Sequence, residues 1–263
     1  MAVLERDRLL ALMDLNMAEM YRAITRATPG GEVEERDGVT LTWSPLGHAL
    51  TNMAIVSGVT TPDAVRGLTD EFYRGPRRLF SVWAPAHGAP VVADELAGVG
   101  FHEFTQSPAM ILLAGDRVGP SSPSSIEVRA VAGDEERIAY ADIMAAAYAV
   151  YGYPERSTAA HFARLDSLHG PATQGFLVCA GGRPVAGATL YAAHGVGGIG
   201  WVGARPEVFG CRYGELATWA VVEEGWRRGV RFMSLQASPM GAPVYRRMGF
   251  STPGAYRVFA PRD

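Results

Sequence analysis

The chain has 263 residues, of which 48% are hydrophobic and 19% charged, and its formal net charge is −3. This length predicts one large or two ordinary domains, and the composition excludes an intrinsically disordered chain. The small negative charge gives no general attraction to nucleic acid or to an anionic membrane, so neither is expected as a partner.

The first half of the chain predicts a long helix, two strands, a helix, a strand, a short helix and a last strand. The long helix is expected over 4–26, because apolar residues recur there near helical spacing. Thr61 is a natural N-cap for the second helix, which carries Pro62 at its first position and is expected to end near Tyr73. The strands are expected over 39–43, 52–57, 79–83 and 104–113, and the short helix over 90–96.

A segment rich in glycine, proline and serine follows, at 115–125. Such a composition is typical of a linker. It predicts a boundary at 118–125 between a first domain at 1–117 and a second at 126–263. The second domain is expected to open with a strand over 126–131, a helix over 134–150 and a helix from Ser157 to Leu168. A hairpin over 176–180 and 184–192 is expected next.

The stretch from Gly198 to Phe250 organises the second half. It predicts a strand over 199–202, a glycine-bearing loop, a helix that ends near Gly229, a strand over 231–236 and a short helix. A glycine loop that runs into a helix N-terminus exposes backbone N–H groups at the positive end of the helix dipole, so it can hold a pyrophosphate. Such loops also simply turn the chain, and the loop alone leaves both interpretations open.

The loop and the segment downstream of it, taken together, resemble the GNAT superfamily of acyl-CoA-dependent N-acyltransferases. The residues that match the family's phosphate loop are Pro206, Glu207, Gly210 and Gly214, and those that match its closing segment are Ser238, Ala242, Tyr245, Gly249 and Phe250. The resemblance implies an α/β (α+β) fold of two GNAT-like mixed sheets flanked by helices, in tandem. The first half, whose ADELAGVGF ending is similar to PVYRRMGF, is expected to be a degenerate copy without a phosphate loop. It is expected to be a structural half, which either packs on the other half or shapes the acceptor pocket, and not a second active site.

The resemblance also implies acetyl-CoA as co-substrate. The residues expected to hold it are Val202, Gly203, Ala204, Phe209, Gly210, Cys211, Arg212, Tyr213, Gly214, Glu215 and Ser238. Backbone N–H groups of Val202 and Gly203 are expected to face the carbonyl oxygen of the thioester, and Tyr245 to protonate the departing thiolate. The alternative for Tyr245 is an ordinary core aromatic residue.

Two loop residues depart from the family pattern. Phe209 stands where arginine or glutamine is common, and Arg212 stands where glycine is common. Loss of that glycine removes freedom for positive φ, although the guanidinium could itself bind a phosphate. The residues expected to contact the acceptor are Tyr148, Tyr151, Tyr153 and His161, for which ordinary packing is the alternative.

The sequence therefore predicts an acetyl-CoA-dependent N-acetyltransferase that acts on a primary amine of a small molecule or peptide. The alternative is a non-catalytic GNAT-like binding or regulatory protein with a weakened CoA site. A Rossmann-type nucleotide enzyme is disfavoured, because no early glycine loop is followed by an acidic residue ~20 positions on. No general base can be assigned, and a homodimer stays open.

The sequence also indicates whether the protein binds a metal and in which compartment it is found. The six histidines show no metal-binding spacing, so no metal is expected. Cys179 and Cys211 do not make a disulfide framework, and the absence of lysine excludes a lysine base. The N-terminus is charged from Glu5 onward, unlike a signal peptide, and no apolar run approaches the ~20 residues of a membrane span. A cytoplasmic protein is expected.

Overall fold

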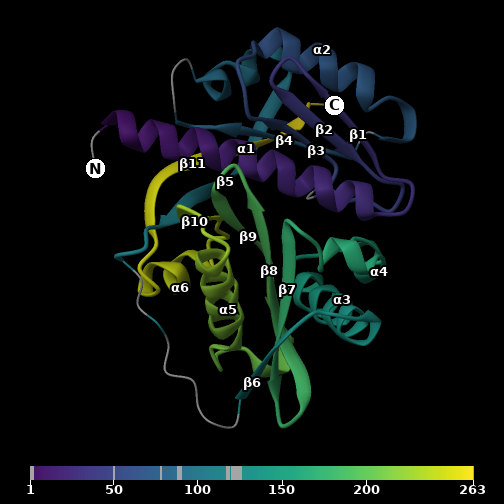
Figure 1. The fold of residues 1–263 in the computed structure, drawn as a ribbon. Helices are drawn as coiled ribbons and strands as arrows, with labels where there is room; N and C mark the ends of the chain where they lie inside the picture. The colour runs from purple at the N-terminus through teal and green to yellow at the C-terminus, as the bar shows by residue number, and fades with distance from the viewer. Residues whose placement is uncertain are drawn as a thin grey trace.

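The computed structural model describes residues 3–49, 51–77, 79–87, 91–116, 119 and 126–262. Strands of both halves join edge to edge in one mixed sheet of eleven strands, in the order β1-β2-β3-β4-β11-β5-β10-β9-β8-β7-β6 (Figure 1). The expected mixed α/β class, with a sheet flanked by helices, is confirmed, and the two expected sheets are continuous. Of the predicted linker at 118–125, only residue 119 is described, so the domain boundary stays a prediction.

The strands are β1 (Glu32–Arg36), β2 (Val39–Trp43), β3 (Met53–Val56), β4 (Ser81–Pro85), β5 (Phe101–Leu112), β6 (Ile126–Ala130), β7 (Thr173–Ala180), β8 (Arg183–Ala193), β9 (Val196–Ala204), β10 (Phe232–Gln236) and β11 (Ser251–Pro261). The α-helices are α1 (Val3–Ala27), α2 (Pro62–Phe72), α3 (Asp134–Ala149), α4 (Glu155–Ala160), α5 (Tyr213–Arg227) and α6 (Ala242–Arg247).

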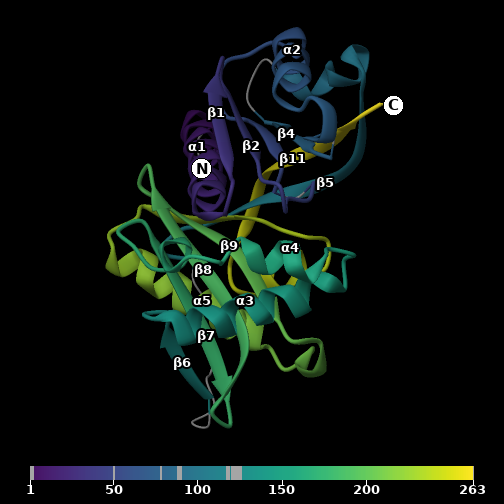
Figure 2. The same ribbon diagram turned by 90° about the vertical axis from the view of Figure 1, so that its right-hand side faces the viewer.

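Two long strands, β5 and β11, tie the halves together. They pair antiparallel with each other along most of their length. Residues 256–259 of β11 also pair with β4 of the first half, and residues 109–112 of β5 pair with β10 of the second half. Each half therefore borders a strand supplied by the other, and Figure 2 shows the C-terminal strand in yellow running up beside β4.

Helix α1 lies across the junction of the halves (Figure 1). Its buried face, which includes Met13 and Met17, packs in one cluster with Trp83 of the first half and Phe232 of the second. A buried polar contact adds to this packing, because the hydroxyl of Tyr256 in β11 donates to Asp14 Oδ1 at 2.5 Å. The helix therefore positions the first half against the second.

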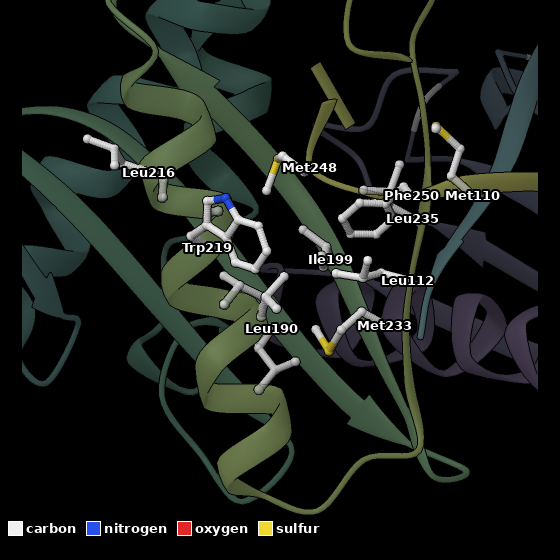
Figure 3. Close-up of a cluster of buried hydrophobic side chains, with 14 of the residues drawn as sticks. Met110, Leu112, Leu190, Ile199, Leu216, Trp219, Met233, Leu235, Met248 and Phe250 are labelled. Carbon is white, nitrogen blue, oxygen red and sulfur yellow. The ribbon is translucent and has the colours of Figure 1, made fainter. Parts of the chain in front are cut away.

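Helix α5 is fixed against the sheet by a core of large apolar side chains. Figure 3 shows Trp219 of α5 beside Leu190 of β8, in a buried cluster that also includes Leu216 of α5 and Ile199 of β9. Leu112 of β5, from the first half, belongs to the same buried cluster. This packing sets the N-terminus of α5 beside the end of β9, where the candidate site lies.

Several element boundaries differ from the sequence prediction. The helix expected from Ser157 to Leu168 is wrong: α4 begins at Glu155, after Pro154 at its N-cap, and ends at Ala160. Proline is favoured at the start of a helix, because the N–H group that it lacks would have no partner within the helix and its fixed φ suits that position. The predicted N-cap of α2 is confirmed, since Ala64 N–H donates to Thr61 Oγ1 at 3.2 Å. The short helix expected over 90–96 is two 3₁₀ turns, Val92–Asp94 and Leu96–Val99, with residue 90 outside the described residues.

Candidate active site

Strands β9 and β10 diverge, which opens a gap in the sheet. They pair only over residues 196–198 of β9 and 232–234 of β10, whereas β9 stays paired with β8 as far as Ala204. The backbone groups of β9 beyond Gly198 that face β10 therefore have no ladder partner in that strand. Such groups are strong donors and acceptors, and a ligand in the gap can satisfy them.

The direction of these N–H groups follows from the pairing with β8. Arg205 N–H donates to the Val185 carbonyl at 2.8 Å. Because hydrogen-bonding direction alternates along an antiparallel ladder, the N–H of Ala204 faces away from β8 and into the gap. The same alternation directs the N–H of Gly203 toward β8. This favours Ala204 over Gly203 as a donor to a bound ligand.

A first cavity, of about 440 Å³, lies between this edge of β9 and the N-terminus of α5. The first intrahelical bond of α5 runs from Leu216 N–H to the Arg212 carbonyl, at 3.1 Å. The N–H groups of Tyr213, Gly214 and Glu215 precede that bond, and Arg212 at the N-cap makes no side-chain capping bond to them. Free N–H groups at the positive end of a helix dipole fit an anion such as a pyrophosphate.

Arg212 adopts the backbone conformation of the glycine that it replaces. Its φ is 62° and its ψ is 17°, in the left-handed region that costs a non-glycine residue about 1 kcal/mol. The guanidinium is anchored on Glu215, with Nε 3.0 Å and Nη2 2.5 Å from the two carboxylate oxygens. The arginine therefore leaves the turn of the loop intact and holds its side chain at the cavity wall.

The charges around the first cavity favour an anionic ligand. The Glu215 side chain is only 4% exposed, and Arg247 Nη2 lies 3.8 Å from its Oε2. Both arginines line the cavity with Glu215. Two guanidinium groups against one carboxylate leave the N-terminus of α5 positively charged, in addition to its dipole.

A second cavity, of about 540 Å³, lies on the other side of the gap. The two cavities share Tyr148, Tyr151, Val202, Ser238 and Tyr245 in their walls. The second cavity is bounded by both halves of the chain, since α1, β4 and β5 supply side chains to it. The arrangement can therefore hold two molecules, one in each cavity, whose reacting ends meet near Tyr245.

Two tyrosines at the junction, Tyr148 and Tyr245, remain protonated at neutral pH. Burial raises the pKa of Tyr245 and that of Tyr148 well above 10. A protonated phenol can donate a proton to a basic leaving group, and it cannot act as a base below its pKa. Burial also raises the pKa of Tyr153 to about 12. Tyr245 can thus serve as an acid at this junction.

The residues predicted to bind the co-substrate gather at the first cavity. Those that line it are Val202, Gly203, Ala204, Phe209, Gly210, Arg212, Tyr213, Gly214, Glu215 and Ser238. Cys211 is exposed and does not line it. Of the predicted acceptor contacts, Tyr148 and Tyr151 line both cavities, and Tyr153 lines the second cavity but not the first. His161 lines neither cavity, because it is buried with Nδ1 3.1 Å from Thr28 Oγ1. The binding roles of these residues stay predictions.

The sequence left open whether the first half shapes the acceptor pocket, and it did not identify the residues that this half contributes. Side chains from this half that line the second cavity include Tyr21, His48, Trp83 and Thr105. They come from α1, the loop before β3, β4 and β5, and no motif joins them. The pairing of β5 with β10, the pairing of β11 with β4 and β5, and the position of α1 bring them to the cavity that Tyr245 also lines.

No group of three or more His, Cys, Asp or Glu side chains suited to a metal ion occurs in the described part of the chain. Within the same residues, no helix combines the length and the apolar character needed to cross a membrane.

Comparisons with known proteins agree with this geometry. Residues 121–246 match the family model of the acetyltransferase (GNAT) domain. The fold is similar to that of a GCN5-related N-acetyltransferase from Kribbella flavida, with 20% identity, 95% of each chain covered and a TM-score of 0.71. It is also similar to a tandem GNAT protein from the clavulanic acid biosynthesis pathway, with 16% identity, a TM-score of 0.57, and 90% of this chain and 86% of the other covered.

A GCN5-related N-acetyltransferase-like protein from Streptococcus suis is similar as well. It is 15% identical, with a TM-score of 0.55, and 99% of this chain and 100% of the other are covered. At these identities the likenesses concern the fold, and they extend over both halves. No match was found among the curated proteins.

Proposed function

Residues 121–246 belong to the GNAT acetyltransferase domain family, and from that premise we propose that the chain transfers an acetyl group from acetyl-CoA to an amine. The observation that carries this proposal is the meeting of two cavities at Tyr245 and Val202, beside the unpaired edge of β9. A two-substrate transfer needs such a junction, because much of its rate comes from holding the reactants together.

The first cavity fits the acyl donor. Free N–H groups of Tyr213, Gly214 and Glu215, the positive end of α5 and the guanidinium of Arg212 suit a diphosphate. Gly210, with φ of 85°, turns the loop, and a Cβ there would meet no atom within 4 Å. In this proposal the pantetheine part follows the edge of β9, where the Ala204 N–H is available.

The second cavity fits the acceptor, and the chemistry takes place between the two. The amine nitrogen attacks the thioester carbonyl, and the backbone N–H of Val202 stabilises the charge that develops on its oxygen. Tyr245 gives its proton to the thiolate as the carbon–sulfur bond breaks. Its raised pKa keeps that proton in place until the thiolate forms.

Two measurements on the purified full chain test this proposal. Acetyl-CoA is expected to raise the melting temperature by mass action, and CoA without the acetyl group should do so as well. A panel of amines with acetyl-CoA should release free thiol, and the product should carry one added acetyl group by mass spectrometry. Stabilisation without transfer to any amine would favour a non-catalytic binding protein, and no stabilisation at millimolar acetyl-CoA would rule out the donor site.

A further inference from the structure

Resting on the acetyl transfer proposed above, we propose that the first half of the chain completes the active site. The second cavity is the acceptor site for an amine carried on an uncharged aromatic or apolar group, and His48 takes the proton from that amine. The family match covers residues 121–246, and it specifies neither the class of acceptor nor the group that accepts a proton. His48 lies outside the matched residues.

The walls of the second cavity come from both halves. Tyr21 of α1 and Trp83 of β4 lie on the side of the first half, and Tyr148 and Trp201 lie on the side of the second. The pairing of β5 with β10 and the packing of α1 against both halves hold these walls together. A molecule in this cavity therefore contacts the first half while its reacting end faces Tyr245.

No aspartate, glutamate, arginine or lysine occurs among the described residues that line this cavity. The first cavity differs in this respect, since Arg212, Glu215 and Arg247 line it. A carboxylate or phosphate on the acceptor would be buried here without a partner of opposite charge, which is costly. The absence of lining charges thus excludes acidic acceptors and acceptors with a second, distant ammonium group.

Aromatic faces make up much of the wall. Tyr148 packs against Trp201 with ring centroids 4.9 Å apart and against Tyr153 at 6.2 Å. Such faces bind aromatic and aliphatic groups, and they attract a single ammonium group through the negative face of each ring. The cavity therefore selects an amine whose remaining surface is uncharged.

His48 stands in this wall on a loop that is braced by hydrogen bonds with Thr51. Its backbone N–H donates to Thr51 Oγ1 at 2.9 Å, and the Thr51 hydroxyl donates back to the His48 carbonyl at 3.0 Å. Its ring meets the edge of the Tyr153 ring with centroids 4.3 Å apart. Nδ1 is buried without a hydrogen-bond partner among the described residues. The imidazole is thus held at the cavity by packing, and within the described part of the chain its Nδ1 makes no hydrogen bond.

His48 is suited to accept a proton at neutral pH. Burial lowers its pKa below 6.5, so the imidazole is neutral. The other titratable groups that line the cavity are tyrosines, namely Tyr21, Tyr148, Tyr151, Tyr153 and Tyr245. Burial raises the pKa of Tyr21 and Tyr148, so these phenols hold their protons and cannot take one from an amine.

The proposed step balances without any further reactant. A nitrogen–carbon bond forms as the carbon–sulfur bond breaks. The acceptor enters as an ammonium group and gives one proton to His48 before it attacks, and the departing thiolate takes the proton of Tyr245. The second proton, which nitrogen loses after the attack, returns to Tyr245 through solvent. His48 releases its own proton to solvent, and the products are an N-acetyl amide, CoA and one proton.

Matched acceptors test the class of substrate. Tyramine and tyrosine share a phenol and an amine, and tyrosine adds a carboxylate, whereas cadaverine carries a second ammonium group in place of the ring. We expect kcat/KM for tyramine to exceed that for tyrosine and for cadaverine at least tenfold, in line with the cost of an unpaired buried charge. Equal or better use of tyrosine or cadaverine would overturn the class.

A substitution in the first half tests whether the amine acceptor binds in the second cavity. Thr105 is exposed at the cavity wall on β5, and His102, on the same strand, is exposed and does not line the cavity. Thr105→Trp is expected to raise the KM for the amine about tenfold and to leave acetyl-CoA binding unchanged, while His102→Trp changes neither. An unchanged amine KM in Thr105→Trp would place the acceptor elsewhere.

A third comparison tests His48. His48→Gln is expected to lower kcat about 100-fold at pH 7, the lower end of the usual contribution of a general base. The defect should shrink toward pH 10, where the amine is already neutral and needs no base. A defect of the same size across this range would show a structural role for His48, and no defect would remove it from the step.

The outcomes separate this inference from the acetyl transfer itself. Calorimetric binding of acetyl-CoA and thiol release with any amine report on the transfer. If acetyl-CoA binds and thiol is released, but charged acceptors are preferred, the proposed acetyl transfer is supported and the proposed site for an uncharged acceptor is wrong. If acetyl-CoA does not bind, the transfer fails first.

Discussion

The hydroxyl of Tyr140 in α3 donates a hydrogen bond to the carbonyl of Trp201 in β9, at 2.7 Å. Trp201 has φ of 49°, an unfavourable conformation for a tryptophan, and lies where the register of β8 and β9 shifts. The bond holds this strained peptide in place. Because the strand turns away from β10 around this point, a buried tyrosine far from the phosphate loop supports the gap between the two cavities.

Removal of this hydroxyl should be costly. Tyr140→Phe leaves the Trp201 carbonyl and the Thr189 hydroxyl without that partner in a buried region, and we expect a loss of about 1–3 kcal/mol in the free energy of unfolding. Urea denaturation measures it. Tyr151→Phe is the matched control, because Tyr151 is 49% exposed and its hydroxyl should contribute less than about 0.5 kcal/mol. Equal stability of the two variants would contradict the support role.

Features that depend on local sequence were predictable. The loop residues Gly210 and Gly214 and the downstream Tyr245 stand at fixed separations, and the fold brings them to one cavity. Helical periodicity marked α1 and α5, because one face of each is buried. Arg212 was expected to hinder the loop, yet its left-handed backbone and its bond to Glu215 accommodate it there.

Features that depend on distant pairing were not predictable. Strand β1 reads EVEER and lacks the apolar alternation that marks a half-buried strand. Strand β11 pairs with β4 and β5, more than 140 residues away, and periodicity does not report a partner at that distance. The acceptor wall with His48 and Trp83 depends on the same long-range pairing, so the sequence could not name the residues of the first half that line it.

The stability of the protein should fall in mild acid because of His161. Its Nδ1 lies 3.1 Å from Thr28 Oγ1, whose hydroxyl donates to the Ile24 carbonyl, so Nδ1 is the donor and the buried ring is neutral. Burial lowers the pKa of His161 from 6.5 to about 4. The unfolded chain therefore binds a proton below pH 6.5 while the folded chain does not, and stability is lost as the pH falls from 6.5 toward 4.

We expect the protonation of His161 in the unfolded chain to lower the free energy of unfolding by about 2 kcal/mol at pH 5 relative to pH 7.5. This value follows from 1.36 kcal/mol per unit of pKa difference. Urea denaturation at both values measures it. His161→Phe should flatten this part of the profile, even if its stability at pH 7.5 is lower, because phenylalanine does not titrate. A profile in His161→Phe as steep as that of the wild type would show that other groups cause the loss.

Arg212 is expected to contribute to donor binding through its guanidinium. In Arg212→Gly the backbone keeps its conformation at lower strain, but the charge is lost, and we expect the Kd for acetyl-CoA to rise about tenfold. The double variant Arg212→Gly with Glu215→Gln avoids an unpaired buried carboxylate and should show the same loss. Arg183→Ala, which removes an exposed arginine outside both cavities, is the control. Unchanged or tighter binding in Arg212→Gly would mean that backbone N–H groups alone hold the diphosphate.

Tyr245→Phe should separate chemistry from binding. The phenol lies at the junction of the cavities with its pKa raised by burial, so its loss removes a proton donor and little contact area. We expect kcat to fall about 100-fold while the Kd for acetyl-CoA stays within about twofold. Thiol release measures the first quantity and calorimetry the second.

Tyr213→Phe is the matched control for that variant, because Tyr213 lines only the donor cavity and should keep its kcat. Acceptors with different amine pKa values sharpen the comparison, since the acid acts on the thiolate and not on the amine. The Tyr245→Phe defect should therefore be similar for weakly and strongly basic amines, in contrast to the defect expected when His48 is replaced. A normal kcat in Tyr245→Phe would leave solvent as the proton source for the thiolate.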